Sequence, residues 1–226
     1  MKYYILRHNG LNIKETGTQF QSISGFAGDI QKDLIPFEGK INFAFKLPEP
    51  LLQNGAKPTT YLNVTFIPNW FLVLKRYFID FLHNFKIEGF QTWDLKVHHK
   101  KNILNDYCLF ILTQTHQNDL IDFSKSEFCI GDFFDCNFIS ETLYINDYEN
   151  FLHIRNELDN KNKFLKDIKI VLNLSKIDLD LFRIINAPAS GYYVSEKLKN
   201  AIEKERFTGF AFQEIEDMDD RIKVIY

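Results

Sequence analysis

The sequence predicts an α+β fold in which mixed or antiparallel sheets pack with a few helices. Two observations indicate it. Apolar–polar alternation typical of strands recurs along the chain, as in 40–46, where Ile41, Phe43 and Phe45 alternate with Asn42, Ala44 and Lys46. Helical spacing of apolar residues is confined to a few segments, of which 193–215 is the clearest.

The segment 193–215 predicts a helix, a turn and a strand in one run. Ser195 is a candidate N-cap, because its hydroxyl can accept a hydrogen bond from a free amide of the first helical turn. Gly209 supplies backbone freedom after the helix, and 210–215 alternates as a half-buried strand does. One apolar helix face is expected from Val194, Leu198, Ala201 and Ile202.

The same kind of segment occurs earlier in the chain. Placing Gly89 on Gly209 aligns 73–95 with 193–215 without a gap, and the Gly-Phe pair is identical in both. Helical periodicity is generic, so two unrelated segments of this kind also align readily. The sequence therefore predicts two similar helix-turn-strand units and leaves open whether they arose by duplication.

The other expected elements follow from periodicity and turn residues. We expect strands at 2–7, 40–46, 61–67, 90–97, 106–113, 137–145, 166–172, 179–185 and 221–225. We expect helices at 70–85, capped by Asn69, and at 147–158, capped by Asp147. The glycine-punctuated segment 10–39 is expected to be mainly loop, and 120–130 is ambiguous.

The domain organisation is expected to be a single α+β body over 1–226. No low-complexity linker divides the 226 residues, and 45% of them are hydrophobic, which is enough to bury a core. Apolar density falls between about 115 and 137, which is where a subdivision would lie.

Charge and cysteine usage restrict the class of protein. A net charge of −3 argues against a nucleic-acid-binding protein, which needs a clustered basic surface. No run approaches 18 apolar residues, so we expect no membrane span. The cysteines are odd in number and widely spaced, which favours a reducing compartment over a disulfide framework. We therefore expect a cytoplasmic protein.

Phenylalanine is unusually frequent, at 23 of 226 residues. Many of these rings are expected in the core. So many aromatic side chains also leave some for a partner surface, where aromatic anchors contribute much of the binding energy.

No catalytic, metal-binding or cofactor-binding set is recognisable. His98 and His99 are adjacent and would point to opposite faces of a strand, and the other histidines have no HxH or HExxH spacing. Ser195 lacks the GxSxG elbow of a nucleophilic serine, and no glycine pattern marks a dinucleotide or phosphate site. We expect a protein that is not an enzyme and that holds no metal or cofactor.

One charged cluster is a candidate partner-binding surface. A basic partner could dock on it and associate faster through electrostatic attraction, although charge runs are usually only solvated. Its members are Glu214, Glu216, Asp217, Asp219 and Asp220.

The C-terminal part of the chain resembles a known family. Val194-Ser195-Glu196-Lys197-Leu198, a short helix and then Phe207-Thr208-Gly209-Phe210-Ala211-Phe212 are similar to the C-terminal signature of a family of bacterial immunity proteins from polymorphic toxin systems. That family also tends to carry an Asp-x-x-x-Ser phrase, here 122–128, and a Leu-Phe-Arg strand, here 181–183. The likeness covers roughly the last 110 residues.

The resemblance implies an intracellular protein that binds a cognate toxin and neutralises it by covering its active surface, without turnover. The family offers no catalytic residue. Ser195, Gly209 and Phe210 match its motif, and their capping and turn chemistry predicts structural roles for them. Two alternatives stay open: a scaffold or regulatory interaction module, and a hydrolase or transferase of unknown type. The sequence does not indicate the toxin or the oligomeric state.

Overall fold

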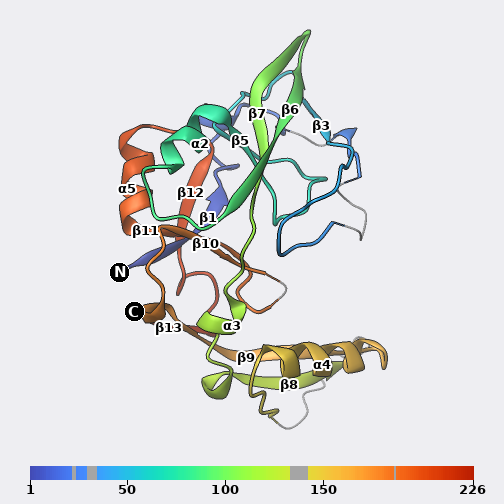
Figure 1. Ribbon diagram of the computed structural model, residues 1–226, viewed down its shortest axis with the longest axis vertical. Helices are drawn as coiled ribbons and strands as arrows, with labels where there is room; N and C mark the ends of the chain where they lie inside the picture. Colours follow the sequence, from blue (N-terminus) through green and yellow to red (C-terminus); the bar gives the residue numbers. More distant parts are fainter. Residues whose placement is uncertain (22–23, 30–34, 133–141, 186) are drawn as a thin grey trace.

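The computed structural model describes residues 1–21, 24–29, 35–132, 142–185 and 187–226 (Figure 1). Within these residues the strands form three sheets, with both parallel and antiparallel pairs, and helices pack beside them. The expected α+β fold is therefore confirmed. The helices are α1 (Ile13–Thr16), α2 (Arg76–Leu82), α3 (Gln117–Leu120), α4 (Tyr148–Asp159) and α5 (Glu196–Lys204).

Sheet A is antiparallel and has the order β10-β11-β1-β12, formed by Leu181–Ile184, Gly191–Ser195, Tyr3–His8 and Phe210–Glu214. Sheet B has the order β2-β3-β6-β7-β5-β4, formed by Ser24–Phe26, Glu49–Leu52, Phe90–His99, Asn102–Leu112, Leu72–Lys75 and Tyr61–Leu62. Sheet C has the order β13-β9-β8, formed by Ile222–Ile225, Lys163–Asn173 and Glu127–Asp132.

The central strands of sheets A and B, β1 and the 107–112 part of β7, are buried on both faces, whereas one face of β6 is exposed at Thr92, Asp94 and Lys96. Along β1, Tyr4 and Leu6 pack into a core with α2, α5 and sheet B, whereas Tyr3 and Ile5 pack into a second core with α4 and sheet C. This alternation is the two-residue period of a strand, with each face given its own apolar partner. The opposite face of sheet B packs against the segments between residues 35 and 71 in a third core.

Sheet A and part of sheet B are built from one repeated unit. Unit 1 consists of β4, β5, α2, β6, β7 and α3, and unit 2 of β10, β11, α5, β12, β1 and α1. Tyr61 faces Leu74 in unit 1, and Leu181 faces Val194 in unit 2, so the strand register is the same at a constant offset of 120. The helix caps, Lys75 and Ser195, are also 120 residues apart.

The central strands of the two units also correspond, at a different offset. Cys108 of β7 faces Leu74, and Tyr4 of β1 faces Val194. The N-terminal strand of the chain thus takes the place in unit 2 that β7 takes in unit 1. The short helices after these strands, α1 and α3, correspond at the same offset of 104. The predicted pair of similar units is therefore present, and each is larger than the sequence indicated.

Reciprocal backbone hydrogen bonds join the two units. The Tyr61 amide at the start of β4 donates to the Thr208 carbonyl (3.0 Å), in the loop before β12. The Asp180 amide just before β10 donates to the Lys86 carbonyl (2.7 Å), in the loop before β6. Between them Phe78 of α2 packs on Phe210, with ring centroids 4.7 Å apart. Each helix-to-strand loop is therefore stabilised by the other unit.

Two expected elements are wrong. Residues 40–46 form no strand, because both backbone groups of Ile41 bond to the Gln91 side chain instead of a neighbouring strand. The helix expected over 70–85 starts only at Arg76, is capped by Lys75 without a side-chain hydrogen bond, and follows strand β5. A short run that is apolar throughout fits a strand buried on both faces as well as a helix, and β5 is such a strand.

The segment expected as a strand over 61–67 is shorter, because only Tyr61–Leu62 pairs as β4. Val194, expected on a helix face, lies in β11 instead. The strand expected over 137–145 lies largely outside the described residues. The remaining expected strands and both caps, Asp147 and Ser195, are confirmed: each capping side chain accepts a hydrogen bond from a first-turn amide, Asn150 and Leu198 respectively.

From α3, the last element of unit 1, the chain passes through a 3₁₀ turn (Phe123–Lys125) into β8. Sheet C and α4 form the layer in the lower part of Figure 1. The drop in apolar density between about 115 and 137 coincides with this passage. Sheet C rejoins the rest through β13 and through the core that it shares with sheet A.

Prediction on the unit interface. Gly209 has φ of +89°, and a Cβ there would lie 2.1 Å from the Tyr61 carbonyl oxygen across the interface. We expect Gly209→Ala to lower the free energy of unfolding by about 3 kcal/mol or more, since a positive φ and a backbone clash combine. Chemical denaturation of the purified variant measures this.

The equivalent Gly89 is the matched control. Its φ is not positive, and its Cβ would meet only the Thr113 hydroxyl oxygen, at 3.0 Å, rather than a backbone atom. Gly89→Ala should cost about 1 kcal/mol or less. Equal losses for the two variants would contradict the assigned interface.

Candidate functional site

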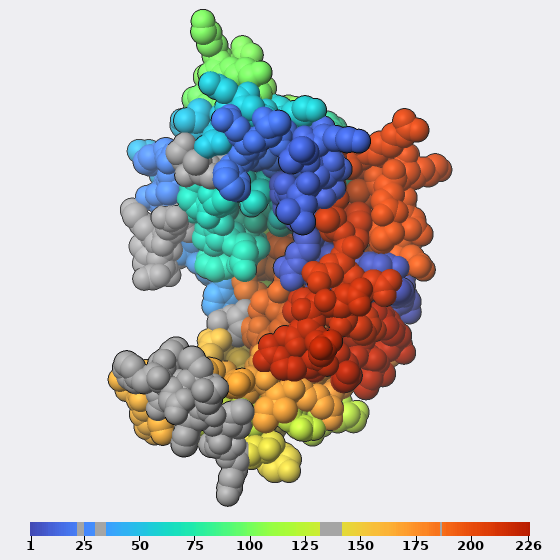
Figure 2. All heavy atoms as spheres, turned by 180° about the vertical axis from the view of Figure 1, so that it is seen from behind, coloured from blue at the N-terminus to red at the C-terminus, as the bar shows by residue number. Residues whose placement is uncertain are grey.

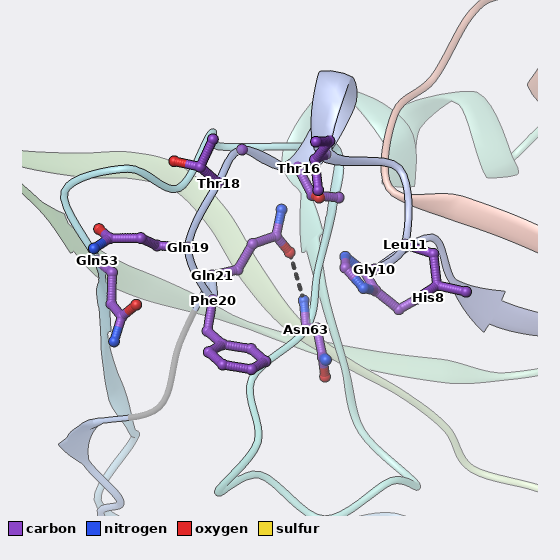
Figure 3. A pocket seen from close by; sticks show the side chains of 12 residues that line it. His8, Gly10, Leu11, Thr16, Thr18, Gln19, Phe20, Gln21, Gln53 and Asn63 are labelled. Atoms are coloured by element: carbon purple, nitrogen blue, oxygen red, sulfur yellow. Dashed lines mark hydrogen bonds between the residues drawn. The ribbon is translucent and has the colours of Figure 1, made fainter.

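A cavity of about 630 Å³ lies between the start of the chain and the 53–63 segment (Figure 3). We call it the α1 cavity. Among the described residues that line it there is no acidic, lysine or arginine side chain, and the walls combine side-chain amides, hydroxyls, one imidazole and apolar groups. The lining residues are His8, Gly10, Leu11, Ile13, Thr16, Gly17, Thr18, Gln19, Phe20, Gln21, Gln53 and Asn63.

Local backbone geometry forms this cavity. β1 ends at His8, and the chain turns through α1 to Gly17, whose φ of +94° lets it pass close to the Gly55 carbonyl. The Thr18 amide then donates to that carbonyl (3.0 Å). Gln21 fixes the far wall: its Nε2 donates to Thr59 Oγ1 (2.7 Å), and its Oε1 accepts from the Asn63 amide (3.0 Å).

His8 is the titratable group of the α1 cavity. Its ring points toward Asn63 and Gln21 in Figure 3, while Phe20 approaches Asn63 from the other side. Both ring nitrogens are buried and have no hydrogen-bond partner among the described residues. Burial lowers the pKa of His8, which the nearby Gln21 amide and Glu15 carboxylate oppose only in part. The imidazole is therefore neutral at pH 7.

The rim of the α1 cavity exposes large apolar side chains. Leu11 is 98% exposed, Ile13 62% and Phe20 68%. Single exposed apolar residues are common, but three around one cavity form a patch of the kind found at binding surfaces.

The candidate acidic residues lie at the end of β12 and in the turn before β13. Glu214, Glu216, Asp217 and Asp220 are exposed, and Asp219 is half-buried. Glu214 pairs with Lys2 (2.8 Å). Hydrogen bonds from the Arg221 side chain and amide lower the pKa of Asp219 to about 2.

Ion pairs within the chain, Glu214 with Lys2 and Asp219 with Arg221, thus neutralise part of the negative charge of this cluster. Glu216 accepts a long hydrogen bond from Tyr226 (3.4 Å), and exposed Asp217 and Asp220 complete the turn. We call 214–220 the acidic turn.

The acidic turn and the α1 cavity belong to one side of the molecule. Tyr4 of β1 faces Glu214 and His8 faces Phe210, so the two features lie at opposite ends of the same strand pair. At about 3.3 Å per residue these ends are roughly 13 Å apart. Figure 2 shows the first residues, in dark blue, and the last residues, in dark red, on the same face.

A second cavity, of about 580 Å³, lies beside α3. In unit 1, α3 takes the place that α1 takes in unit 2. Its lining is charged. His116 Nε2 lies 2.7 Å from Glu88 Oε2, and Nδ1 lies 3.6 Å from Asp119 Oδ2. Because carboxylates already occupy both sides of His116, this cavity differs from the α1 cavity, where the histidine has no such partner.

Ser195 has the structural role that the sequence predicted. It is fully buried, its Oγ accepts from the Leu198 amide (3.1 Å), and the same hydroxyl donates to Asp180 Oδ1 (2.6 Å). Asp180 Oδ2 accepts from the Lys86 amide (3.0 Å) and from Lys197 Nζ (3.1 Å). The carboxylate thus joins the loop of unit 1 to the helix of unit 2.

Gly209 and Phe210 are placed at the unit interface. The Gly209 amide donates to Glu15 Oε1 (2.6 Å), which ties α1 to the loop before β12. Phe210 is buried against Phe78 and Tyr61.

The two other segments of the resemblance also have structural partners. Ser126 Oγ accepts from the Val171 amide (3.0 Å), which joins 122–128 to β9. Arg183 is buried, and its guanidinium donates to the carbonyls of Gln114 (3.3 Å), Trp70 (3.5 Å) and Phe37. Burial lowers the pKa of Arg183.

Histidines and cysteines show no joint site. Among the described residues, no group of three or more His, Cys, Asp or Glu side chains is arranged to hold a metal ion. Cys108 and Cys129 are buried free thiols, and burial raises the pKa of Cys108 to about 12. Cys136 lies outside the described residues.

A comparison of the chain with models of protein families finds no match, and neither does a comparison with curated proteins. The resemblance to immunity proteins therefore stays a prediction. In the part of the chain that the structure describes, no helix is long and apolar enough to cross a membrane.

Sequence reasoning missed the α1 cavity. Its residues lie in the segment expected to be mainly loop, and its far wall comes from 53–63. The available signal was the presence of Leu11, Ile13 and Phe20 in a polar, glycine-punctuated stretch, where large apolar residues have no periodic face to join.

Prediction on Asp180. Burial raises its pKa, but the hydrogen bonds from Ser195, the Lys86 amide and Lys197 together hold it below the ordinary value of 3.8. A depressed carboxyl pKa stabilises the fold above pH 3.8, and this contribution is lost as the pH falls further. Asp180→Asn should therefore be less stable at pH 7, by about 2 kcal/mol, and the difference from wild type should narrow below pH 4.

Urea unfolding at pH 7, 5, 4 and 3 measures this difference. Asp178→Asn is the control, since Asp178 is exposed and, among the described residues, forms an ion pair with the Lys86 side chain at the surface. A difference that stays constant with pH for Asp180→Asn would contradict the assigned network.

Proposed function

We propose that the chain is a non-catalytic immunity protein that binds a cognate bacterial toxin and neutralises it by covering the toxin's active surface. In this proposal it acts in the cytoplasm of the cell that makes the toxin. The interacting face contains the α1 cavity and the acidic turn.

One observation carries the proposal. Three exposed apolar side chains surround a cavity whose described lining has no acidic, lysine or arginine side chain, and an acidic turn lies on the same side. An apolar centre supplies binding energy, and a charged region nearby accelerates encounter with an oppositely charged partner. Leu11, Ile13 and Phe20 would be the apolar anchors. Glu216, Asp217 and Asp220 would attract a basic toxin surface.

The resemblance supports the proposal from a second direction. Its motif residues, 194–198 and 207–212, occupy one continuous strand-helix-strand part of unit 2. Ser195 and Gly209, which match the motif, have structural roles there, as capping and backbone geometry predicted. A frame specified in this way can carry different toxin-facing loops, because loops tolerate change more than the elements that they connect.

The alternative is a scaffold or regulatory module, which would use the same exposed face without a toxin. The two differ in what the partner does to a cell. An immunity protein must abolish the toxicity of its partner, whereas a scaffold has no such effect.

Prediction on neutralisation. The tagged chain is used to capture its partner from native cells, and the partner's C-terminal region is then expressed in a test bacterium. We expect growth arrest that co-expression of the wild-type chain relieves. Leu11→Asp combined with Phe20→Asp should weaken binding by about 100-fold, since two apolar anchors are lost, and should abolish the relief.

Ile103→Asp is the matched control, because Ile103 is also exposed but lies near the tip of the β6–β7 hairpin. The Ile103→Asp variant should relieve the growth arrest as well as the wild-type chain does. A captured partner that does not arrest growth would contradict the proposed function. Relief of growth arrest that survives the double substitution would contradict the proposed face.

Prediction on the acidic turn. Glu216→Lys with Asp217→Lys should slow association with the captured toxin by about tenfold at low salt, with little change in dissociation. Glu157→Lys with Asp159→Lys makes the same change in net charge on α4 and is the control. Surface plasmon resonance at two salt concentrations measures both rates. Equal slowing by both pairs would show that only net charge matters.

A further inference from the structure

The β6–β7 hairpin ends in a basic turn. His99 faces Asn102 across the hairpin, so the turn between them consists of Lys100 and Lys101, and both lysines are exposed. Lys96, further back on β6, is exposed as well. The chain as a whole has a net charge of −3, so the hairpin end carries a charge of the opposite sign.

The acidic side chains of the same two strands do not neutralise these three lysines. Asp94 of β6 pairs with Arg76 of α2 (2.5 Å), and Asp106 of β7 pairs with Lys75 (2.9 Å). The three lysines themselves form no ion pair among the described residues. Their charge is therefore available to a partner outside the chain.

Exposed apolar side chains lie beside this basic turn. Leu51 of β3 faces His98 of β6, and His98 faces Ile103 of β7. Facing residues point to the same side of a sheet, so Leu51 and Ile103 flank His98 on one face, and both are exposed. The other face at this level is buried, because Leu52 and Val97 belong to the third core.

Phe26 of β2 extends the exposed face. It faces Glu49, which lies two residues before Leu51 and therefore points to the same side. The Phe26 ring is exposed, and Lys46 Nζ lies 4.4 Å from its centroid. Glu49 itself is engaged, since its Oε2 lies 3.2 Å from His98 Nε2. We define the hairpin surface as Phe26, Lys46, Leu51, Lys96, Lys100, Lys101 and Ile103.

The hairpin surface lies at one extremity of the molecule. The tip of β6 and β7 forms the upper end of the long axis in Figure 1, and the same tip, in green, projects at the top of Figure 2. A projecting tip meets a flat partner without interference from the rest of the chain. A folded protein partner is less suited to it, because a stable protein interface needs about 800 Å² of matched surface on each side.

The turn backbone gives a further indication. Lys100 has φ of +56°, a conformation that favours glycine or asparagine. A lysine at this position makes folding less favourable, so fold stability does not account for its charge at the tip. Residues held in such conformations are often found where a protein contacts a partner.

We propose that the hairpin surface docks on an anionic lipid bilayer. The lysine ammonium groups contact the lipid phosphates, and Ile103 and Leu51 enter the boundary between headgroups and acyl chains. A charge run alone is usually only solvated, but lysines beside exposed apolar side chains are typical of segments that bind a membrane surface. A nucleic acid would engage the lysines through its phosphates and leave the apolar side chains without a partner.

This docking does not rest on the proposed function. It uses none of the residues assigned to the α1 cavity or the acidic turn, so vesicle binding and toxin neutralisation can fail separately.

The test is co-sedimentation of the full chain with lipid vesicles. We expect binding to vesicles made of equal parts phosphatidylglycerol and phosphatidylcholine, and none to phosphatidylcholine alone. Binding should weaken as salt is added, because salt screens the attraction between the lysines and the lipid phosphates. No binding at about 1 mM mixed lipid, or equal binding to both kinds of vesicle, would overturn the inference.

A lysine pair tests the charged contacts. Lys100→Gln with Lys101→Gln should weaken binding to the mixed vesicles about 25-fold, since each lysine near an anionic surface contributes about fivefold. Lys161→Gln with Lys204→Gln removes the same charge from exposed positions after α4 and at the end of α5, and should bind as the wild type does. Equal weakening by the two pairs would show that net charge alone decides binding and would overturn the assigned surface.

Ile103→Ser tests the apolar contact. Ile103 is exposed, so the variant should fold normally, and its binding to the mixed vesicles should weaken about tenfold with an unchanged dependence on salt. Unchanged binding would overturn the insertion of this residue. A short DNA duplex and poly-L-glutamate test other anionic partners: binding to either that survives more salt than binding to the mixed vesicles would overturn the assignment to a bilayer.

Discussion

The Asp180 carboxylate joins the two halves of this protein, and the rest of the structure depends on that contact and its counterpart at Tyr61. Asp180 receives hydrogen bonds from Ser195 at the start of α5 and from the Lys86 amide in the other unit. The Tyr61 amide donates to the Thr208 carbonyl, and the Tyr61 carbonyl lies against Gly209 in the same loop. Each unit stabilises the turn of the other, and neither has a complete core alone, because Phe78 of α2 in unit 1 packs on Phe210 of β12 in unit 2.

The two units differ in the chemistry of the cavities beside their short helices, α1 and α3. The two units have the same strand register, but the loops after their central strands differ. After β1, α1 leads into a cavity whose described lining has no acidic, lysine or arginine side chain, and whose His8 ring nitrogens have no hydrogen-bond partner among the described residues. After β7, α3 leads into a charged cavity in which Glu88 pairs with His116. A repeated frame thus carries two different surfaces at corresponding positions.

Local sequence signals predicted much of the frame. Ser195 and Asp147 were identified as caps because a cap needs only the few residues around it. The strand hidden in 70–85 could not be separated from a helix, since a run that is apolar throughout fits both. The register shared by the units, the burial of Arg183 and the α1 cavity depend on contacts between distant segments, which one sequence does not specify.

We propose that one face, formed by the α1 cavity and the acidic turn, binds the partner. Hydrogen exchange of the chain with and without its captured partner shows which residues the partner covers. We expect slower exchange in 9–21 and 210–220 in the complex, and no change at the tip of the β6–β7 hairpin. Protection confined to the hairpin, or to the exposed faces of α2 and α5, would contradict the claim.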